Sequence, residues 1–456
     1  RLELSVFANE YRMAGTLDGS YFQELEILDV DSCAFSTLDV QNNPALKKIN
    51  CASNRLSALD LSRNVNLWQL NCANNNITGL DVSHNLDMGV LNCSTNQLST
   101  LDLSKQARLV SLYCAGNNLT ALNLSGNPNL AALDCANNSI SALDLTGNGK
   151  LAFLSCSGNP LNTSMSMAET TGLKTLYAAD TQLKGVDVSQ NRELILLYSP
   201  NNSIKSLNVA VNQDLRVLVC PYNNLSKLDL SANVNLDWLD CSDNRLKEVT
   251  VGHGLSTLYF GNNLLKFSTM QVGDASEHGE ISGLTQLVDA GLVERETLID
   301  LSSEYEIYGS FTTFQWFDGL TPITLPDWGY GYFYADPAYL YRTLTCQMSN
   351  PAFPGTTVNY HVTIDTITKG EDGIQASKTQ NQLTVYPNPV RDVLHIKALS
   401  PIKSVEIYDM SGRLVKNEAQ ESSKYEISVN DMPQGIYVLK TIGLSGRALT
   451  SKIEKQ

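Results

Sequence analysis

The side chains that could bind a soft metal ion or act as nucleophiles in this chain are ten cysteines and five histidines. The sequence has no CxxC pair, no HExxH motif and no two histidines close together, so the spacings typical of metal sites are missing. It also lacks a GxSxG motif, a P-loop and a GxGxxG motif between a strand and a helix. Cys33 and Cys346 are the two cysteines that could be catalytic, and neither has a histidine nearby in the sequence. We therefore expect no catalytic residue, metal or cofactor, and an exported enzyme is the least favoured alternative.

Single carboxylates also recur at regular intervals, each inside an LD[LV] triplet. Calcium prefers a dense cage of several oxygen ligands, which a row of single carboxylates does not supply. Aspartates at such positions are typical of turns in which the side chain accepts a hydrogen bond from a backbone amide. We therefore favour a structural role over a calcium site. The row comprises Asp39, Asp60, Asp81, Asp102, Asp144, Asp187 and Asp229, interrupted by Asn123, Asn208 and Thr250.

Both kinds of residue belong to a phrase of 21 residues that recurs along the chain with the skeleton LxxLxCxxNxLxxLDLSxNxx. Self-similarity at such a period predicts a solenoid, here of about twelve turns between residues 25 and 266. The step from Cys156 to Ala178 is 22 residues long, so Met165 and Met167 stand where leucines are expected. The residues at the cysteine position are Val30, Cys51, Cys72, Cys93, Cys114, Cys135, Cys156, Ala178, Ser199, Cys220, Cys241 and Phe260.

The spacing of the cysteines predicts free, buried thiols. Successive cysteines would stack at the strand spacing of about 4.8 Å with parallel Cβ vectors. A disulfide needs Cβ atoms roughly 3.5–4.5 Å apart that point toward each other. The row is therefore expected to pack as small hydrophobic groups.

Two rows of asparagines are expected to satisfy backbone groups of the turns that would otherwise be buried without partners. The first row is Asn54, Asn75, Asn96, Asn117, Asn138, Asn159, Asn202, Asn223, Asn244 and Asn263, with Cys33 and Thr181 in the equivalent places. The second row is Asn43, Asn64, Asn85, Asn127, Asn148, Asn191, Asn212 and Asn233.

This skeleton resembles the leucine-rich repeat family, and the cysteine row at a 21-residue period is most similar to the internalin J-like proteins of Gram-positive bacteria. The resemblance covers about residues 25–265. It implies a curved solenoid with a parallel sheet on its concave side, and by analogy a role in adhesion or colonisation. Because one fold serves many functions, the exposed surface has to be considered separately.

The residues that flank the buried leucine of each short strand should face outward on the concave side, since alternate side chains take opposite faces of a strand. The early turns carry polar residues there, such as Lys48 and Gln69, whereas the later turns collect apolar and aromatic ones. Exposed aromatic clusters usually mark interaction sites, and Tyr and Trp are common binding hot spots. The alternative is a face covered by the next domain or by self-contact. The candidate binding residues are Tyr113, Phe153, Tyr177, Leu196, Tyr198, Val217, Val219, Trp238 and Tyr259.

The remaining segments indicate caps and two further domains. Residues 1–24 are expected to cap the open end of the solenoid, and residues 267–297 to form a C-terminal cap and linker. Residues 298–366 contain short alternating runs that predict a small β-sandwich. Trp316 followed by Cys346 is similar to the Trp and second Cys of an immunoglobulin domain, although no earlier cysteine is present in this segment. Residues 367–382 are predicted to be a polar linker.

Residues 383–456 predict a second β-sandwich, through the phrases LTVYPNPVRDVLHI, SVEIYDMSGRLV and MPQGIYVLK. These phrases, in this order, resemble the type A C-terminal sorting domain of type IX secretion. The resemblance implies a bacterium of the Bacteroidetes group and passage across the outer membrane. It also implies removal of the domain with attachment of the protein to surface lipopolysaccharide.

Length and charge limit the remaining possibilities. The chain has 456 residues, too many for one core, and a net charge of −15, which disfavours nucleic acid and anionic lipid as partners. No apolar run approaches the roughly 18 residues needed to span a membrane. The sequence starts at Arg1 without a methionine or a signal-peptide core, which suggests a processed product.

The sequence thus predicts a mainly β protein, a leucine-rich repeat solenoid followed by two β-sandwiches. We expect a cell-surface or secreted, internalin-like adhesin that binds a protein or glycan of a host or bacterial surface. Such binding would serve attachment, colonisation, virulence or biofilm formation. Residues 383–456 would contact the type IX secretion machinery. The alternative is a structural matrix protein that self-associates.

Overall fold

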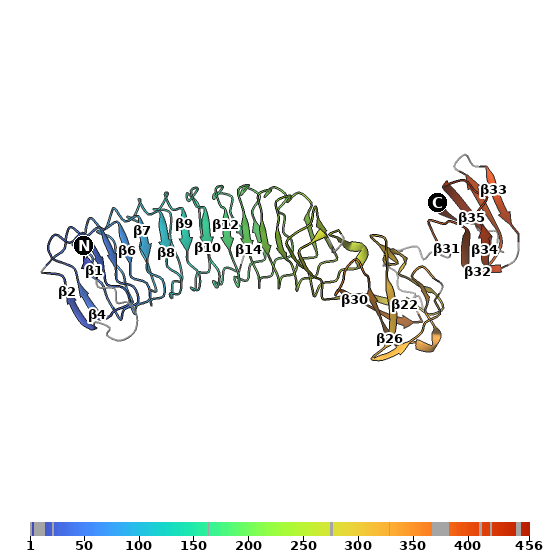
Figure 1. Cartoon of the computed structure of the whole chain (residues 1–456), viewed down its shortest axis with the longest axis horizontal. Coiled ribbons are helices and arrows are strands. Elements are labelled where there is room, and N and C mark those ends of the chain that lie inside the picture. Colours follow the sequence, from blue (N-terminus) through green and yellow to red (C-terminus); the bar gives the residue numbers. More distant parts are fainter. Residues whose placement is uncertain are drawn as a thin grey trace, which may run out of the picture. The chain divides into compact units, whose positions relative to one another are not determined.

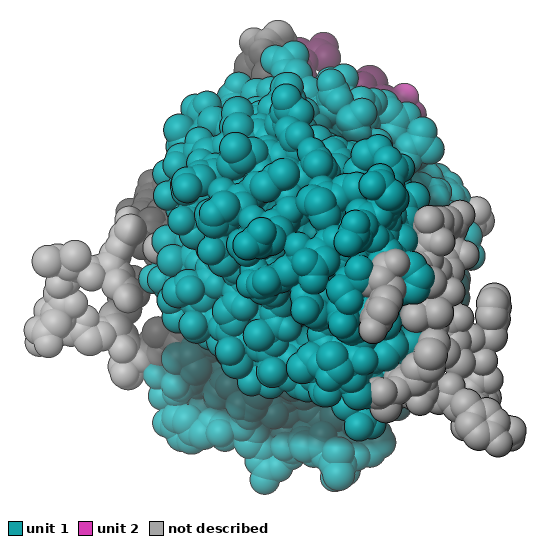
Figure 2. All heavy atoms as spheres, turned by 90° about the vertical axis from the view of Figure 1, so that its left-hand side faces the viewer, with its two compact units in different colours: residues 1–367 teal, residues 368–456 magenta. Residues whose placement is uncertain are grey.

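The computed structural model describes residues 2–3, 14–20, 22–162, 164–273, 277–327, 329–366, 383–409, 413–419, 422–443 and 448–456. The chain forms two compact units, Arg1–Ile367 and Thr368–Gln456 (Figure 1). Figure 2 shows the atoms of the first unit in teal and those of the second in magenta. The predicted linker at 367–382 lies outside the described residues, as do Phe7, Tyr11 and Tyr21 of the predicted N-terminal cap.

The first unit contains a solenoid, in which every turn contributes one short strand to a 14-stranded parallel sheet (Figure 1). The predicted solenoid of about twelve turns is confirmed. Strands β1 (Leu2–Glu3) and β21 (Glu280–Ser282) lie at the two edges of this sheet. Between them lie β3 (Ile27–Asp29), β5 (Lys48–Asn50), β6 (Gln69–Asn71), β7 (Val90–Asn92), β8 (Ser111–Tyr113), β9 (Ala132–Asp134), β10 (Phe153–Ser155), β12 (Thr175–Tyr177), β14 (Leu196–Tyr198), β15 (Val217–Val219), β17 (Trp238–Asp240) and β19 (Thr257–Tyr259).

The second halves of some repeats form three short parallel sheets of their own, separate from the 14-stranded sheet. Parallel pairing joins β2 (Ala14–Asp18) to β4 (Ala34–Asp39) and β11 (Ser164–Ser166) to β13 (Gly185–Asp187). A third sheet contains β16 (Lys227–Leu230), β18 (Glu248–Val251) and β20 (Met270–Gln271). The 3-10 helix η1 (Phe267–Thr269) directly precedes β20.

The core of the solenoid is a stack of leucine and cysteine rows. All ten cysteines are free and buried, as the spacing predicted. Met165 and Met167 are buried in the leucine rows across the 22-residue step. Because a coil alone cannot bury these rows, each turn is stabilised mainly by its neighbours.

The asparagine rows hold the turns together by hydrogen bonds between successive coils. Asn138 donates from Nδ2 to the carbonyl oxygens of Cys114 and Cys135, both at 3.0 Å, and its Oδ1 accepts from the Leu119 amide at 3.0 Å. Asn148, in the second row, donates to the Leu124 and Asn127 carbonyls at 3.3 and 3.0 Å. The two rows thus satisfy backbone groups, as expected.

The aspartate row also has the predicted structural role. Asp60 Oδ1 accepts a hydrogen bond from the Ser62 amide at 2.9 Å, and the same contact recurs at Asp102, Asp144 and Asp229. Hydrogen bonds from the side chain and amide of Ser62 hold the pKa of Asp60 below its usual value. Within the described residues, no group of three or more His, Cys, Asp or Glu side chains could hold a metal ion.

A five-stranded mixed sheet follows the solenoid in the same unit. Its order is β22 (Thr285–Glu294), β30 (Thr357–Asp365), β29 (Thr343–Ser349), β26 (Thr313–Asp318) and β27 (Thr321–Ile323). Strand β23 (Leu298–Asp300) pairs with β28 (Tyr332–Tyr334), and β24 (Glu306–Ile307) with β25 (Ser310–Phe311). The 3-10 helices η3 (Ser302–Glu304) and η4 (Pro337–Tyr339) lie between these strands.

Strand β22 belongs to the five-stranded sheet, although it lies within residues 267–297, the predicted C-terminal cap and linker. It pairs in parallel with β30, but its register shifts between Asp289 and Leu292, and Gly291 has φ of 74°. This irregularity interrupts the alternation that identifies a strand in the sequence. Trp316 and Cys346 are buried cross-strand partners on β26 and β29. The likeness to an immunoglobulin domain stays a prediction.

The solenoid and the five-stranded sheet are joined by buried contacts. The rings of Phe267 and Phe353 stack with their centroids 5.7 Å apart. The buried Glu304 carboxylate accepts hydrogen bonds from the amide of Ser268, at 3.0 Å, and from its hydroxyl. A buried carboxylate is costly unless it is hydrogen-bonded, so these contacts attach the domain that contains the five-stranded sheet to the end of the solenoid.

The second unit is a six-stranded sheet region with its own core. Its strands are β31 (Leu383–Tyr386), β32 (Val393–Asp409), β33 (Leu414–Glu418), β34 (Ser422–Ser428), β35 (Gly435–Gly443) and β36 (Ala448–Lys455). The long β32 pairs with β31 and β34 through its first half, and with β33 and β35 through its second half. Leu394, Val405, Leu439 and Ile453 are buried in its core.

Candidate binding surface

The candidate surface is the outward side of the 14-stranded sheet, which we call the sheet face. Each of the twelve strands of this sheet from β3 to β19 has three residues, and its middle leucine or isoleucine is buried. The first and third residues point outward because side chains alternate across a strand. In-register parallel pairing aligns these residues into two columns, the entry column of first residues and the exit column of third residues.

Eight of the nine candidate residues lie together on this face. Leu196, Val217 and Trp238 are neighbours in the entry column, and Tyr177, Tyr198 and Val219 are neighbours in the exit column. Phe153 and Tyr259 extend the group at its two ends. We call this set of eight residues the aromatic strip. At about 4.8 Å per strand, the strip from β10 to β19 is about 24 Å long.

Ring contacts run along the strip. The centroids of Phe153 and Tyr177 are 6.0 Å apart and those of Tyr177 and Tyr198 are 5.6 Å apart. Trp238 meets Tyr259 edge-to-face at 6.3 Å. Such contacts restrict ring motion, so a ligand would meet rings that are already ordered.

Two of the rings are open to solvent. Tyr198 is 36% exposed and Trp238 is 42% exposed, so neither is packed under another domain of the first unit. The other members of the strip are half-buried by their neighbours on the sheet face. Large exposed aromatic groups on a sheet are unfavourable in water, which makes their concentration on consecutive turns a candidate interaction site.

Tyr113 does not belong to the strip. It lies in the exit column of β8, where its cross-strand partners are Asn92 and Asp134. The polar Asp134 and Ser155 separate it from Tyr177 in that column. The sequence pattern correctly predicted that Tyr113 faces outward, but it did not predict that polar residues separate Tyr113 from the strip.

Carboxylates border the strip at its last turns. Asp240 lies in the exit column between Val219 and Tyr259, and Glu280 is the entry-column residue of β21. A hydrogen bond with the Glu280 side chain raises the pKa of Tyr259, and burial and nearby carboxylates raise it further. The Tyr259 hydroxyl therefore stays protonated at neutral pH and can donate a hydrogen bond.

Two exposed aromatic residues were missed by reading the two outward rows alone. Trp68 stands one residue before the entry column, lies against Gly89, and has the Lys48 ammonium 5.6 Å from its ring centroid. Tyr222 is 58% exposed and has φ of 54°. At the equivalent place of other turns, Asn201 and Asp243 adopt the same conformation. A bulky tyrosine in the left-handed region is unusual, and this departure from the repeat was the available signal.

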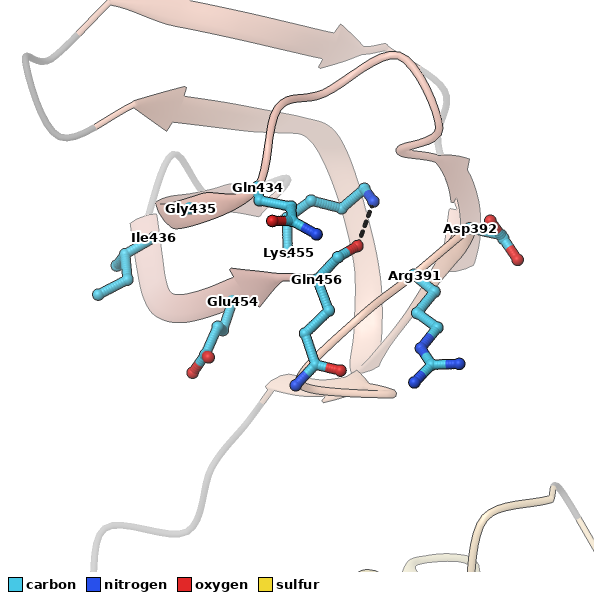
Figure 3. A pocket seen from close by; sticks show the side chains of 8 residues that line it. All are labelled: Arg391, Asp392, Gln434, Gly435, Ile436, Glu454, Lys455 and Gln456. Carbon is cyan, nitrogen blue, oxygen red and sulfur yellow. Dashed lines mark hydrogen bonds between the residues drawn. The ribbon is translucent and has the colours of Figure 1, made fainter.

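Cys33 and Cys346, the two candidate nucleophiles, are both buried, and burial raises the pKa of the Cys346 thiol. A cavity of about 740 Å³ lies in the second unit (Figure 3). Its lining mixes acids, bases and amides and contains no Ser, Cys or His. The lining residues are Arg391, Asp392, Gln434, Gly435, Ile436, Glu454, Lys455 and Gln456.

Comparison with known proteins identifies the two folds. Residues 384–455 match the family described as the secretion system C-terminal sorting domain. The functional domain of InlJ from Listeria monocytogenes, which includes a cysteine ladder, has 24% identity and a TM-score of 0.56. That match covers 76% of this chain and 87% of the InlJ chain. PEPR1, in the crystal structure of PEPR1–AtPEP1, has 18% identity and a TM-score of 0.51, covering 62% of this chain and 45% of that one. No curated protein matches the chain.

These findings show a leucine-rich repeat solenoid and a C-terminal sorting domain in one chain. The sorting domain directs export by type IX secretion, so the protein belongs at the cell surface or outside the cell. None of the helices in the described part of the chain is long and apolar enough to cross a membrane.

Proposed function

We propose that this exported protein is an adhesin that binds a protein or glycan of a host or bacterial surface through the aromatic strip. The observation that carries the proposal is the in-register strip of rings on the sheet face, with Tyr198 and Trp238 open to solvent. Neighbouring repeats bury the leucines, not the flanking residues, so the repeat itself does not require aromatic groups there.

The dimensions of the strip suit an extended ligand. A length of about 24 Å accommodates roughly seven residues of an extended polypeptide. The rings supply large contact areas, and Tyr hydroxyls with Asp240 supply polar contacts at the edge. The structural neighbour PEPR1 was solved with AtPEP1, which supports a binding role for such a solenoid. Export to the surface places the strip where it can meet other cells.

The test measures adhesion of beads coated with the full chain to cultured epithelial cells and to other bacteria. Trp238→Ala and Tyr198→Ala are expected to weaken adhesion at least tenfold, because removing a hot-spot aromatic costs about 2 kcal/mol or more. Their melting temperatures should stay near that of the unchanged protein, because neither ring is buried and both changes leave the leucine core in place. Gln69→Ala, in the entry column of an early turn, is the matched control and should have little effect.

Equal effects of the two sets of variants would contradict the proposal, as would aromatic variants that mainly lower the melting temperature. Sedimentation of the same proteins tests the alternative of a self-associating matrix protein. If Trp238→Ala abolishes self-association and no surface is bound, the strip is a contact between copies and the adhesin proposal is wrong.

A further inference from the structure

A second group of exposed aromatic residues lies in the domain that follows the solenoid. The ring of Tyr305 contacts Phe311 at a centroid distance of 5.3 Å and Tyr330 at 5.4 Å. Phe311 is 59% exposed and Tyr330 is 52% exposed. We call these three residues the Tyr305 cluster. They come from the end of η3, from β25 and from the turn before β28, so the fold gathers them from three separate segments.

The segment of the chain that contains the cluster carries charges of one sign. Residues 296–341 contain no lysine, arginine or histidine, whereas Asp300, Glu306 and Asp327 are exposed carboxylates in this range. Glu306 is the cross-strand partner of Phe311 in the β24–β25 hairpin. Directly opposed residues of antiparallel strands have Cβ atoms about 4.5–5.5 Å apart, so this carboxylate lies beside an exposed ring.

A second carboxylate is held near the other side of the cluster. The Leu301 amide donates to the Gly331 carbonyl at 2.9 Å, which brings the segment after Asp300 against the segment after Tyr330. Burial raises the pKa of Tyr332, a hydrogen bond with the Ser302 side chain lowers it, and the Asp300 carboxylate raises it. Asp300 Oδ1 accepts hydrogen bonds from the Ser302 amide at 3.0 Å and from the Ser302 hydroxyl at 2.7 Å. Among the described residues, neither Asp300 nor Glu306 forms a salt bridge, so no cation there neutralises either carboxylate.

The backbone holds the cluster in an unusual conformation. Tyr330 has φ of 55°, a strained region that bulky residues rarely adopt, whereas glycine would adopt it freely. Tyr308, in the hairpin turn, also has positive φ, but its hydroxyl bonds to the Met270 carbonyl and the Gly273 amide, both at 3.2 Å. The hairpin is therefore tied to the end of the solenoid, whereas no hydrogen bond within the described part of the chain explains the tyrosine at 330.

We propose that the Tyr305 cluster is a second binding site that takes an arginine or lysine side chain from a basic segment of a protein partner. Ring faces attract cations, and adjacent carboxylates strengthen that attraction. A second copy of this chain is a poor occupant, because its net charge is −15. An anionic glycan would be repelled by these carboxylates, and a neutral glycan would gain no electrostatic attraction from them.

The site is separate from the aromatic strip. The hairpin is attached through Met270 to β20, which belongs to the three-stranded sheet with β16 and β18. The strip lies on the 14-stranded sheet. Loss of one site therefore need not affect the other.

The experiment measures fluorescence anisotropy of a labelled dodecapeptide of alternating arginine and glycine, titrated with the full chain at low salt. The double variant Phe311→Ala/Tyr330→Ala is expected to bind about five- to thirtyfold more weakly, from two exposed cation–π contacts. Glu306→Gln should weaken binding and reduce its salt dependence. Leu320→Ala, an almost fully exposed apolar residue of the same domain, is the matched control and should bind like the unchanged protein.

Tyr330→Gly separates binding from folding. Glycine adopts positive φ without strain, so this variant should keep or raise the melting temperature while losing affinity. The proposal is wrong if the ring variants bind the peptide as well as Leu320→Ala does. The proposal is also wrong if the ring variants no longer bind a neutral β-glucan, such as laminarin, but still bind the peptide with unchanged affinity.

Discussion

Raising the pH above 9 is expected to destabilise the solenoid, because its buried cysteines must stay protonated. Burial raises the pKa of Cys51, Cys93 and Cys156 from the ordinary value of 9.0 to about 12. In the unfolded chain these thiols ionise near pH 9, whereas in the folded chain they do not. Their contribution to stability is therefore complete below pH 9 and is lost as the pH rises toward 12.

The size of this effect follows from linkage. Between pH 9 and 12, each such thiol lowers the free energy of unfolding by about 1.4 kcal/mol per pH unit. At pH 10 these three thiols together cost about 4 kcal/mol, a large part of a typical stability of 5–15 kcal/mol. Burial raises the pKa of Cys72, Cys114, Cys135 and Cys241 as well, which adds to the loss in the same direction.

Urea denaturation followed by circular dichroism at pH 8, 9 and 10 measures how the free energy of unfolding changes with pH. The control is Cys93→Ala, since Ala178 already occupies this row. Loss of the sulfur atom lowers the stability of this variant equally at each pH, but above pH 9 its free energy of unfolding should fall less steeply, by about 1.4 kcal/mol per pH unit. Equal slopes for the two proteins, or thiolate absorbance at 240 nm that rises near pH 9 in the folded state, would refute the reasoning.

Two further changes test the asparagine row and the sorting domain. Asn138→Ala leaves backbone groups of two adjacent coils buried without partners and should lower the free energy of unfolding by about 2–5 kcal/mol in urea denaturation. Asn127→Gln should cost much less, because Gln106 already occupies that row; similar losses would contradict this distinction between the rows. Deleting residues 383–456 should leave the solenoid folded but retain the protein inside the cell envelope, as measured by surface labelling of intact cells. Normal display of the shortened chain would show that this segment is not needed for export.

The sequence predicts the solenoid well because every buried position repeats. A leucine, cysteine or asparagine at a fixed interval has one environment, created by the coils before and after it, so its role can be inferred from the period. Even the 22-residue step was predicted correctly, since Met165 and Met167 are buried where leucines were expected.

The rest of the fold was harder to predict because nothing repeats there. Strand β22 escaped detection because its alternation breaks at a bulge near Gly291, and the pairing that defines it comes from β30, far along the chain. The contact of Glu304 with Ser268 is also long-range. Such pairings depend on tertiary structure that local patterns do not encode.

The candidate surfaces also differ in how well they could be predicted, depending on whether their residues follow the repeat. The aromatic strip could be predicted because the period fixes both the outward direction and the neighbour of each residue. Trp68 and Tyr222 were missed because they lie outside the two rows that alternate with the buried leucine. The Tyr305 cluster was missed because its three rings come from segments with no periodic relation. Its composition, aromatic and without basic residues over 296–341, was nevertheless visible in the sequence.

The separation of buried and outward positions has a consequence for how binding can change. The residues that stack the coils and those that face outward alternate along each strand, so they rarely share a contact partner. A substitution at Trp238 or Tyr198 removes a ring from the sheet face and leaves the leucine core in place, whereas one at Leu239, the buried neighbour of Trp238 on β17, would open a cavity. Partner preference on the sheet face can therefore vary at little cost in stability. The Tyr305 cluster differs, because Tyr330 keeps a strained backbone that Gly would relieve, and its retention requires a reason other than folding.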